Sequence, residues 1–191
     1  MPAWKLLLGR GEPQSTTTDA STQVGWALLV PPGLMNTATA FGSYTAVFLD
    51  PGWFVGEAPD RVVDLGRRRA AAILDEIDSD PDSHRPPAAL NGVLEPDGSE
   101  LGAVIRSMAD CARLDGIAAG LGVSPQQLRR LVRQHSGSTF SEIRRWARLT
   151  RAVEILQTST IAAAAVDAGF ADQAHLTRTS ARMLGRTLLD R

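Results

Sequence analysis

The chain has 191 residues, of which 43% are apolar, and a formal net charge of −1. This length and composition allow one large or two small domains and exclude a chain that is disordered throughout. The single cysteine, Cys111, excludes an internal disulfide framework. The most apolar stretch, residues 24–35, contains two prolines and is too short to span a bilayer, and no signal peptide is evident. We therefore expect a soluble, cytoplasmic protein.

The two halves of the chain differ in charge. Residues 1–98 contain 7 Lys and Arg against 13 Asp and Glu, whereas residues 99–191 contain 13 against 8. The first half is therefore net acidic and the second net basic, which indicates that only the second half meets a polyanion. An uneven spread of charge over solvated faces is the alternative explanation.

The first 56 residues have the pattern of β structure. Three apolar or alternating runs, Trp4–Leu8, Gly25–Val30 and Tyr44–Leu49, are separated by clusters of Gly, Pro, Ser and Thr. After them we predict a helix over residues 61–77, followed by a linker in the stretch DSDPDSHRPP. The aromatic residues of this half either line a ligand pocket or fill a small core, and the core is the favoured interpretation; they are Trp26, Trp53 and Phe54.

Helical periodicity takes over after residue 98. We predict helices over residues 99–111 and 114–121, then a turn, and then a helix that begins with Ser124 as its N-cap. Ser at the N-cap, Pro at the first position and Gln at the third are a strong helix-start signal. One face of this helix is apolar and carries Leu128, Leu131 and Val132. The other face is polar and carries Gln126, Arg129, Arg130 and Arg133.

A second capping-box signal, Thr139 with Glu142, opens a longer helix that we predict to end at about Gln157. Apolar residues recur along it every three to four positions, as in a helix with a buried face. At about 1.5 Å per residue this helix would span about 27 Å, somewhat less than one turn of DNA.

Residues 117–137 and 164–185 repeat one pattern about 48 residues apart. In both copies a short helix is followed by a glycine turn and a second helix; in the second copy Asp172 is a good N-cap. The matching positions are Ala118 with Ala165, Gly122 with Gly169, Leu128 with Leu176, Arg130 with Arg178 and Gly137 with Gly185. This is the pattern of helix-turn-helix units, and two of them joined by one helix suit neighbouring turns of a DNA groove. A bundle of similar helices is the alternative.

Three motifs carry a resemblance to a known family: GVSPQQLRRLVRQHSG, the linker-helix run RLTRAVEIL, and above all AGFADQAHLTR. With them, residues 98–191 resemble the C-terminal DNA-binding domain of the AraC/XylS transcription regulators. The resemblance implies that the second helix of each unit enters the major groove of DNA. The base-contact candidates that it implies are Gln126, Arg129 and Arg130 in the first unit and Gln173, Ala174, Thr177 and Arg178 in the second.

The chemistry of these side chains suits DNA. Arg can bind guanine with two hydrogen bonds, Gln can pair with adenine, and Thr or Ala can contact the methyl group of thymine. Other residues suit phosphate groups, which set the register of a protein on DNA without reporting its sequence. The phosphate-contact candidates are Ser124, Arg133, Thr139 and Arg148.

The chain departs from the family pattern in both halves. Thr179 and Ser180 follow Arg178 where the family places an aromatic residue, and Leu188 stands where the family has proline, so we expect a looser second unit. In the first half, the stretch LLVPPGLMNTATAFGSYTAVFLDP resembles the last strands of the family's cupin-like sensing domain, in a shortened form. No histidine precedes His84, which excludes a histidine metal centre in the β region.

Neither a glycine-rich phosphate loop nor a metal-ligand or catalytic pattern occurs in the sequence. We interpret His175 as a solvated residue at a helix start, and His135 as a residue whose charge is favourable at a helix end. Cys111 is predicted to be a small core residue.

Together these patterns predict an α+β protein. A small antiparallel, partly cupin-like β module would occupy residues 1–56 and a helix and linker residues 57–97. Residues 98–191 would form an all-α DNA-binding domain of two helix-turn-helix units, at about 114–137 and 160–185, joined by a long linker helix.

The predicted function is sequence-specific DNA-binding transcription regulation, without enzymatic activity, cofactor or metal. The predicted partner is double-stranded promoter or operator DNA, which implies a cytoplasmic, nucleoid-associated location. RNA polymerase and an unidentified small-molecule effector are further candidate partners, and the choice between monomer and homodimer stays open. The alternative function is a protein-interaction or ligand-sensing module whose DNA-binding domain has decayed.

Overall fold

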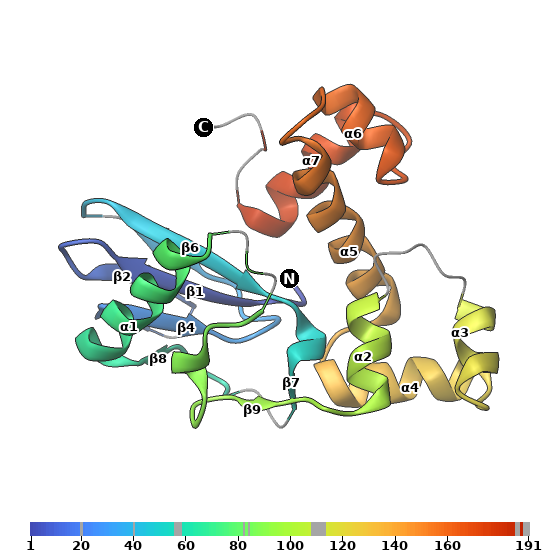
Figure 1. Cartoon of the computed structure of the whole chain (residues 1–191), viewed down its shortest axis with the longest axis horizontal. Helices are drawn as coiled ribbons and strands as arrows, with labels where there is room; N and C mark the ends of the chain where they lie inside the picture. Colours follow the sequence, from blue (N-terminus) through green and yellow to red (C-terminus); the bar gives the residue numbers. More distant parts are fainter. Residues whose placement is uncertain are drawn as a thin grey trace.

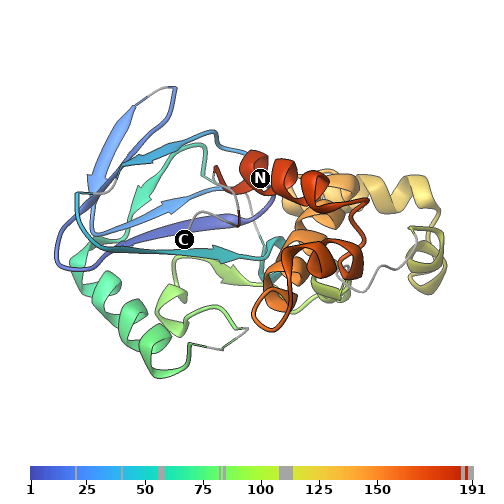
Figure 2. The ribbon, with the colours of Figure 1, turned by 90° about the horizontal axis from the view of Figure 1, so that it is seen from above.

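The computed structural model describes residues 1–19, 21–39, 41–55, 59–81, 83, 85–107, 114–185 and 188. Cys111 and His84, on which we made predictions, lie outside the described residues. The chain forms two parts, which we call the β part (residues 1–96) and the helical part (residues 100–184). Figures 1 and 2 show the helical part packed against one end of the β part. Within the described ranges, none of the helices has both the length and the apolarity needed to cross a membrane.

The β part contains two main antiparallel sheets. One has the strand order β6-β1-β4-β8, the other has the order β3-β2-β5, and β7 pairs with β9. The strands are β1 (Trp4–Gly9), β2 (Gln14–Thr17), β3 (Thr22–Gly25), β4 (Ala27–Val30), β5 (Thr37–Thr39), β6 (Tyr44–Leu49), β7 (Phe54–Val55), β8 (Val63–Asp64) and β9 (Glu95–Pro96). The three strands predicted from apolar runs are confirmed as β1, β4 and β6, although the run at Gly25–Val30 is divided between the ends of β3 and β4.

The sheet of β3, β2 and β5 was not predicted. Its strands are rich in Thr, Ser and Gln, and we had interpreted these residues as separators between strands. Thr is β-branched and favours extended backbone, but the alternation of apolar and polar residues that marks a half-buried strand is missing here. In β2 the polar side chains of Gln14, Ser15 and Thr16 are themselves buried.

Helix α1 (Gly66–Ser79) covers one face of the larger sheet (Figure 1). Its Ala70 and Ile73 are buried with Trp4, Leu6 and Leu8 of β1. The same cluster includes Phe54 as a buried member and the two tryptophans as half-buried members, which supports the core interpretation of these aromatic residues; they are Trp26 and Trp53.

The predicted start of this helix at Arg61 was wrong. Val63 and Asp64 instead form β8, which pairs with Leu28 and Leu29 of β4. The helix begins only at Gly66, whose positive φ of 79° turns the chain out of the strand, a conformation that glycine adopts without steric cost. Asp64 supports the turn, because its Oδ1 accepts a hydrogen bond of 3.0 Å from the Gly66 amide.

The helical part consists of α2 (Glu100–Ser107), α3 (Leu114–Gly120), α4 (Pro125–Ser136), α5 (Phe140–Ile155), α6 (Ile161–Asp167) and α7 (Gln173–Leu184). Helices α3 and α4 form the first helix-turn-helix unit and α6 and α7 the second, with α5 between them (Figure 1). Side-chain oxygens cap three of these helices as predicted: Ser124 for α4, Thr139 for α5 and Asp172 for α7. Thr160 caps α6 in the same way, although it was not predicted to do so. Helices α4 and α7 both end at a left-handed glycine, Gly137 and Gly185, so the repeat of the sequence is a repeat of structure.

The first unit has its own apolar core. Leu128 and Val132 of α4 are fully buried against Ala118 of α3 and Ile143 of α5, and Ile105 of α2 joins them. Leu131, which we also placed in the core, is half-buried. Helix α2 therefore belongs to the packing of the first unit.

The second unit shares its core with the β part. Trp146, Phe170 and Leu176 form one cluster with Ala3, and the half-buried Phe48 packs against it. The rings of Phe48 and Trp146 lie 5.7 Å apart between centroids, at an angle of 54°. In Figures 1 and 2 the N-terminal end of the chain lies beside α7, in agreement with these contacts.

Thr179 and Ser180, where the family pattern has an aromatic residue, are buried in α7. The Ser180 hydroxyl donates a hydrogen bond of 2.9 Å to the Thr177 carbonyl, so its polar atom is paired inside its own helix. The apolar contacts of this unit come in part from the β part, where we had expected only a missing anchor.

Because Phe48 joins the β part to the second unit, we predict that Phe48→Ala destabilises both. The free energy of unfolding should fall by about 2 kcal/mol, less than the roughly 3–5 kcal/mol of a fully buried Phe, and amide hydrogen exchange in α7 should accelerate. Phe41 is 62% exposed and provides the matched control; Phe41→Ala should change the stability by no more than about 0.5 kcal/mol. Unchanged exchange in α7 of the Phe48 variant would contradict a shared core.

The capping box of α5 makes a pH-dependent contribution. The Thr139 amide and hydroxyl each donate a hydrogen bond of 2.7 Å to Glu142 Oε2. These bonds hold the pKa of the Glu142 carboxyl below its ordinary value. Because folding lowers this pKa, the stabilisation is present above the unfolded pKa of about 4.3 and is lost as the pH falls through the folded pKa.

We therefore predict that Glu142→Gln destabilises the chain at pH 7, by a few tenths to about 1 kcal/mol. This difference from wild type should shrink and then disappear as the pH of the unfolding curves falls through the folded pKa of Glu142, because the carboxyl then becomes neutral. Glu154→Gln, in the last turn of the same helix, is the matched control and should not destabilise at pH 7, because a negative charge there opposes the helix dipole. Equal losses for the two variants would be evidence against the cap.

Candidate nucleic-acid interface

Helix α4 separates its apolar and polar residues cleanly. Leu128 and Val132 are completely buried, whereas Gln126, Arg129 and Arg130 on the other side are exposed. Arg133, one turn further along, is exposed as well. All four predicted DNA-contacting side chains of α4 therefore share an accessible face.

Helix α7 repeats this arrangement with fewer charges. Leu176 is completely buried, and Gln173, Ala174 and Arg178 are exposed, while Thr177 is half-buried. Three of the four base-contact candidates of the second unit thus lie on the surface, and the fourth lies at the edge of the core.

His175 has a structural role at the start of α7. Its amide donates a hydrogen bond of 2.6 Å to Asp172 Oδ1, and its Nδ1 accepts one of 3.4 Å from the Ala171 amide. The imidazole packs edge-on against Phe170, with 5.2 Å between the ring centroids. The ring therefore belongs to the turn between α6 and α7, which accounts for a histidine here without catalysis.

The linker helix determines how far apart the two units lie. Helix α5 has 16 residues, which corresponds to a length of about 24 Å. The two units lie at its opposite ends (Figure 1). Its Phe140, Ile143 and Ala147 pack in the first unit, and its Leu149 and Ala152 pack in the second.

The four phosphate-contact candidates differ in their surroundings. Arg133 is exposed. The hydroxyls of Ser124 and Thr139 already accept hydrogen bonds from the amides of Gln127 and Glu142. At these two positions a phosphate would therefore contact the helix N-terminus and not the hydroxyl. Arg148 is half-buried; its Nε is buried and has no hydrogen-bond partner among the described residues.

Arg148 also lies against the second unit. A Cβ added to Gly169, in the turn between α6 and α7, would lie 3.6 Å from Arg148 Nε. Gly169 itself has a positive φ of 79°, as a helix-ending turn requires. The side chain of Arg148 therefore fills space between α5 and this turn.

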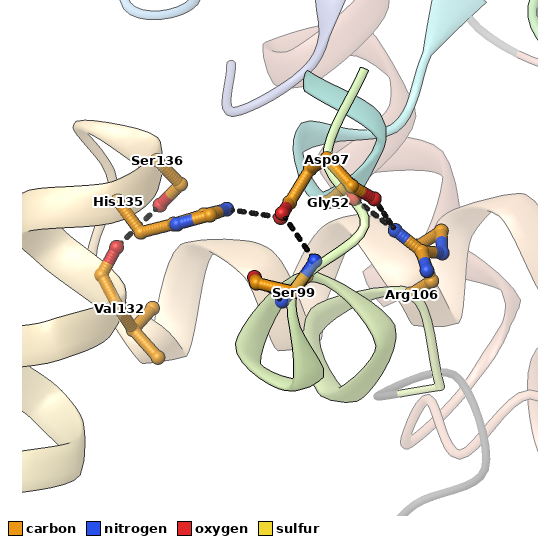
Figure 3. A network of polar contacts seen from close by, with 8 residues as sticks. Gly52, Asp97, Ser99, Arg106, Val132, His135 and Ser136 are labelled. Atoms are coloured by element: carbon orange, nitrogen blue, oxygen red, sulfur yellow. Dashed lines mark hydrogen bonds and ion pairs between the residues drawn. The ribbon is translucent and has the colours of Figure 1, made fainter. Parts of the chain in front are cut away.

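The sequence interpretation missed a polar network at the junction of the two parts (Figure 3). His135 Nε2 lies 2.7 Å from Asp97 Oδ2, and the two side chains are only 12% and 1% exposed. Arg106 of α2 donates to the carbonyl of Gly52 and, at 3.3 Å, to that of Asp97. The available signal was Asp97 two residues before Ser99, a spacing at which Asp accepts a hydrogen bond from the backbone at a helix start.

A second polar contact joins α5 to the β part. Trp146 Nε1 donates a hydrogen bond of 2.6 Å to Asp50 Oδ1, between residues 96 positions apart in the chain. A cavity of about 240 Å³ lies beside it, between α2, α5 and the short helical turn Pro51–Trp53. Its walls include Trp53, Arg106 and Thr150, so both parts of the chain contribute to it.

Within the described ranges no group of three or more His, Cys, Asp or Glu side chains lies close enough to hold a metal ion. The polar groups of the junction contact one another and link structural elements. The exposed Arg and Gln side chains of α4 and α7 are therefore the features that suit a large polyanionic partner.

Comparison with known proteins agrees with this geometry. Residues 117–190 match the sequence model of a helix-turn-helix domain family. ToxT from Vibrio cholerae aligns with 98% of this chain and 88% of its own length, with a TM-score of 0.64 and 10% identity. Its unsaturated fatty acid bound form aligns with 97% and 84%, with a TM-score of 0.62 and 11% identity.

A transcriptional regulator from Chromobacterium violaceum, described as AraC-type, is 28% identical over 46% of this chain and 81% of its own, with a TM-score of 0.42. Among curated protein sequences, none matches the chain.

The likeness to ToxT is one of fold, and it extends over the β part as well as the helical part. The predicted fold class, a small antiparallel β module followed by two helix-turn-helix units and their linker helix, is thereby confirmed. Residues 117–190 therefore carry a helix-turn-helix domain, in a chain whose fold is similar to that of ToxT.

Proposed function

We propose that this chain is a DNA-binding transcription regulator of the AraC/XylS type. It would bind a specific promoter or operator site by inserting α4 and α7 into successive major grooves of double-stranded DNA. The observation that carries the proposal is the shared construction of the two helices. Each buries one apolar face and exposes Gln and Arg on the other, and α5 holds them at its two ends. A spacing of about 24 Å by the linker helix is compatible with neighbouring turns of a duplex.

The proposed base contacts follow from side-chain chemistry. Arg129 and Arg130 on α4 and Arg178 on α7 are exposed and suit guanine, which offers two acceptors in the major groove. Gln126 and Gln173 suit adenine. The smaller side chains of α7, Ala174 and Thr177, suit the methyl group of thymine.

The proposed phosphate contacts would set the register of the protein on the duplex. Arg133 is exposed beside the base-contacting face of α4. Ser124 and Thr139 stand at helix N-termini, where backbone amides and the helix dipole favour a phosphate. Arg148 is the least accessible of the four, because its guanidinium lies against Gly169.

The further parts of the proposal concern domain limits, partners and location. We keep the division at residues 56 and 97 as a proposal for the sensing module and the linker. ToxT has been solved with an unsaturated fatty acid bound. By analogy, a small-molecule effector is a candidate partner here, and the cavity beside Trp146, which residues of both parts line, is its candidate site. We further propose RNA polymerase as a candidate protein partner and a nucleoid-associated location. The proposal allows either a monomer or a homodimer.

Site selection from random DNA, followed by a titration of affinity, tests the proposal. Arg129→Ala and Arg178→Ala should each weaken binding to the selected site by about 1–3 kcal/mol, roughly 5- to 150-fold, and relax the preference at one base pair. The two base pairs should lie in different half-sites. The affinity for wild type should also fall steeply with salt, because bound phosphates release counterions.

Arg68→Ala provides the matched control, because Arg68 is equally exposed but lies on α1 of the β part. This variant should bind the selected site as tightly as wild type. Tight binding by both the Arg129 and the Arg178 variant would overturn the groove assignment. Failure to select any site would favour the alternative, a protein-interaction or ligand-sensing module with a decayed DNA-binding domain.

A further inference from the structure

We propose that Asp97 and His135 are positioning residues that hold the first recognition helix, α4, in a defined orientation to the β part. The inference rests on the proposed function, because it concerns how α4 is presented to DNA. It is carried by a buried contact: Asp97 Oδ2 and His135 Nε2 are 2.7 Å apart, on side chains that are almost inaccessible to water (Figure 3).

His135 is placed to act on α4 without touching DNA. It follows Leu128 and Val132 at helical spacing on the buried side of α4, opposite Arg129 and Arg130. It lies in the last turn of α4, where a positive charge is also favoured by the helix dipole. A change at His135 therefore reaches the proposed interface only through the placement of the helix.

Asp97 is held firmly from the other side. Its amide donates a hydrogen bond of 2.8 Å to the Trp53 carbonyl, and its Oδ1 accepts one of 2.8 Å from the Ser99 amide at the start of α2. The Arg106 guanidinium also bonds the Asp97 carbonyl and stacks 4.7 Å from the centroid of the Trp53 ring. Contacts with the β part and with α2 therefore hold Asp97 in place, independently of its contact with α4.

The charge of Asp97 is supported by these neighbours. Burial by itself would raise the pKa of the Asp97 carboxyl, but the hydrogen bonds from Ser99 and the nearby charge of His135 outweigh it and keep the pKa below its ordinary value. An anionic carboxylate that is buried beside an imidazole is costly to the fold when its partner is removed, because the charge is then left uncompensated.

Two glycines make this joint tight. A Cβ added to Gly102 of α2 would overlap Asp97 Oδ2, the atom that faces His135. A Cβ added to Gly52 would lie 2.6 Å from the Gly102 carbonyl oxygen, closer than real Cβ atoms approach. The β part and α2 therefore meet backbone to backbone at this point, and a small displacement at Gly102 moves the carboxylate that holds α4.

The test compares four full-length variants on the selected DNA site. His135→Ala and Asp97→Asn remove one member of the pair, His135→Gln retains a hydrogen-bond donor, and Glu95→Gln changes an exposed carboxylate two residues away as the matched control. We expect His135→Ala and Asp97→Asn to weaken binding by about tenfold, as for pairs in direct contact. His135→Gln should recover part of the loss, and the control should bind as wild type does.

The decisive measurement repeats these titrations on DNA in which the half-site of α4 has been scrambled. If the pair positions α4, the variants should then bind as wild type does, because the contribution of α4 has already been removed. Equal losses on the intact and the scrambled DNA would mean general destabilisation and would overturn the proposal, as would wild-type affinity of His135→Ala for the intact site.

Hydrogen exchange without DNA separates this proposal from the proposed function. In His135→Ala the amides of α4 should exchange faster than in wild type, while those of α7 should be unchanged. If wild type selects no DNA site, the proposed function is wrong, and the exchange rates in α4 still decide whether the pair holds the helix: unchanged rates would reject it. Gly102→Ala, which displaces the carboxylate without altering either charge, should accelerate the same amides.

Discussion

Helix α5 is the constraint on which the arrangement of this protein depends, because three groups of contacts use its different sides. Ile143 and Ala147 complete the core of the first helix-turn-helix unit, and Leu149 and Ala152 complete that of the second. Trp146, between them, packs against Phe48 and bonds Asp50 of the β part. A single rigid element therefore sets the distance between the units and their relation to the β part, and a bend in it would disturb all three together.

Local signals made the helical part predictable from the sequence. Ser124 and Thr139 were recognised as N-caps because a capping box needs only residues three positions apart, and the glycine turns follow from the same short-range geometry. The buried and exposed faces of α4 followed from helical spacing, and those of α7 from its match to α4 in the repeat. The individual base-contact candidates came from the family resemblance. The resemblance to AraC/XylS regulators assigned these faces a partner.

Contacts between distant segments were beyond that reasoning. The strands β2, β3 and β5 are rich in Thr and Ser and lack an alternation of apolar and polar residues. Their sheet depends on pairing between the strands, which the sequence pattern does not predict. Likewise, nothing in the local sequence around Phe48 or Trp146 predicts that the two rings are in contact. The position of His135 at a helix end was predicted, but its contact with Asp97 depends on the fold.

These distant contacts change how the β part should be regarded. It reaches the second unit through the apolar packing of Ala3 and Phe48, and the first unit through the polar joint at Asp97. The two connections differ in chemistry: one is apolar burial, whereas the other is a buried contact between a carboxylate and an imidazole. The β part therefore contacts both helix-turn-helix units, and α4 and α7 are each linked to it as well as to α5.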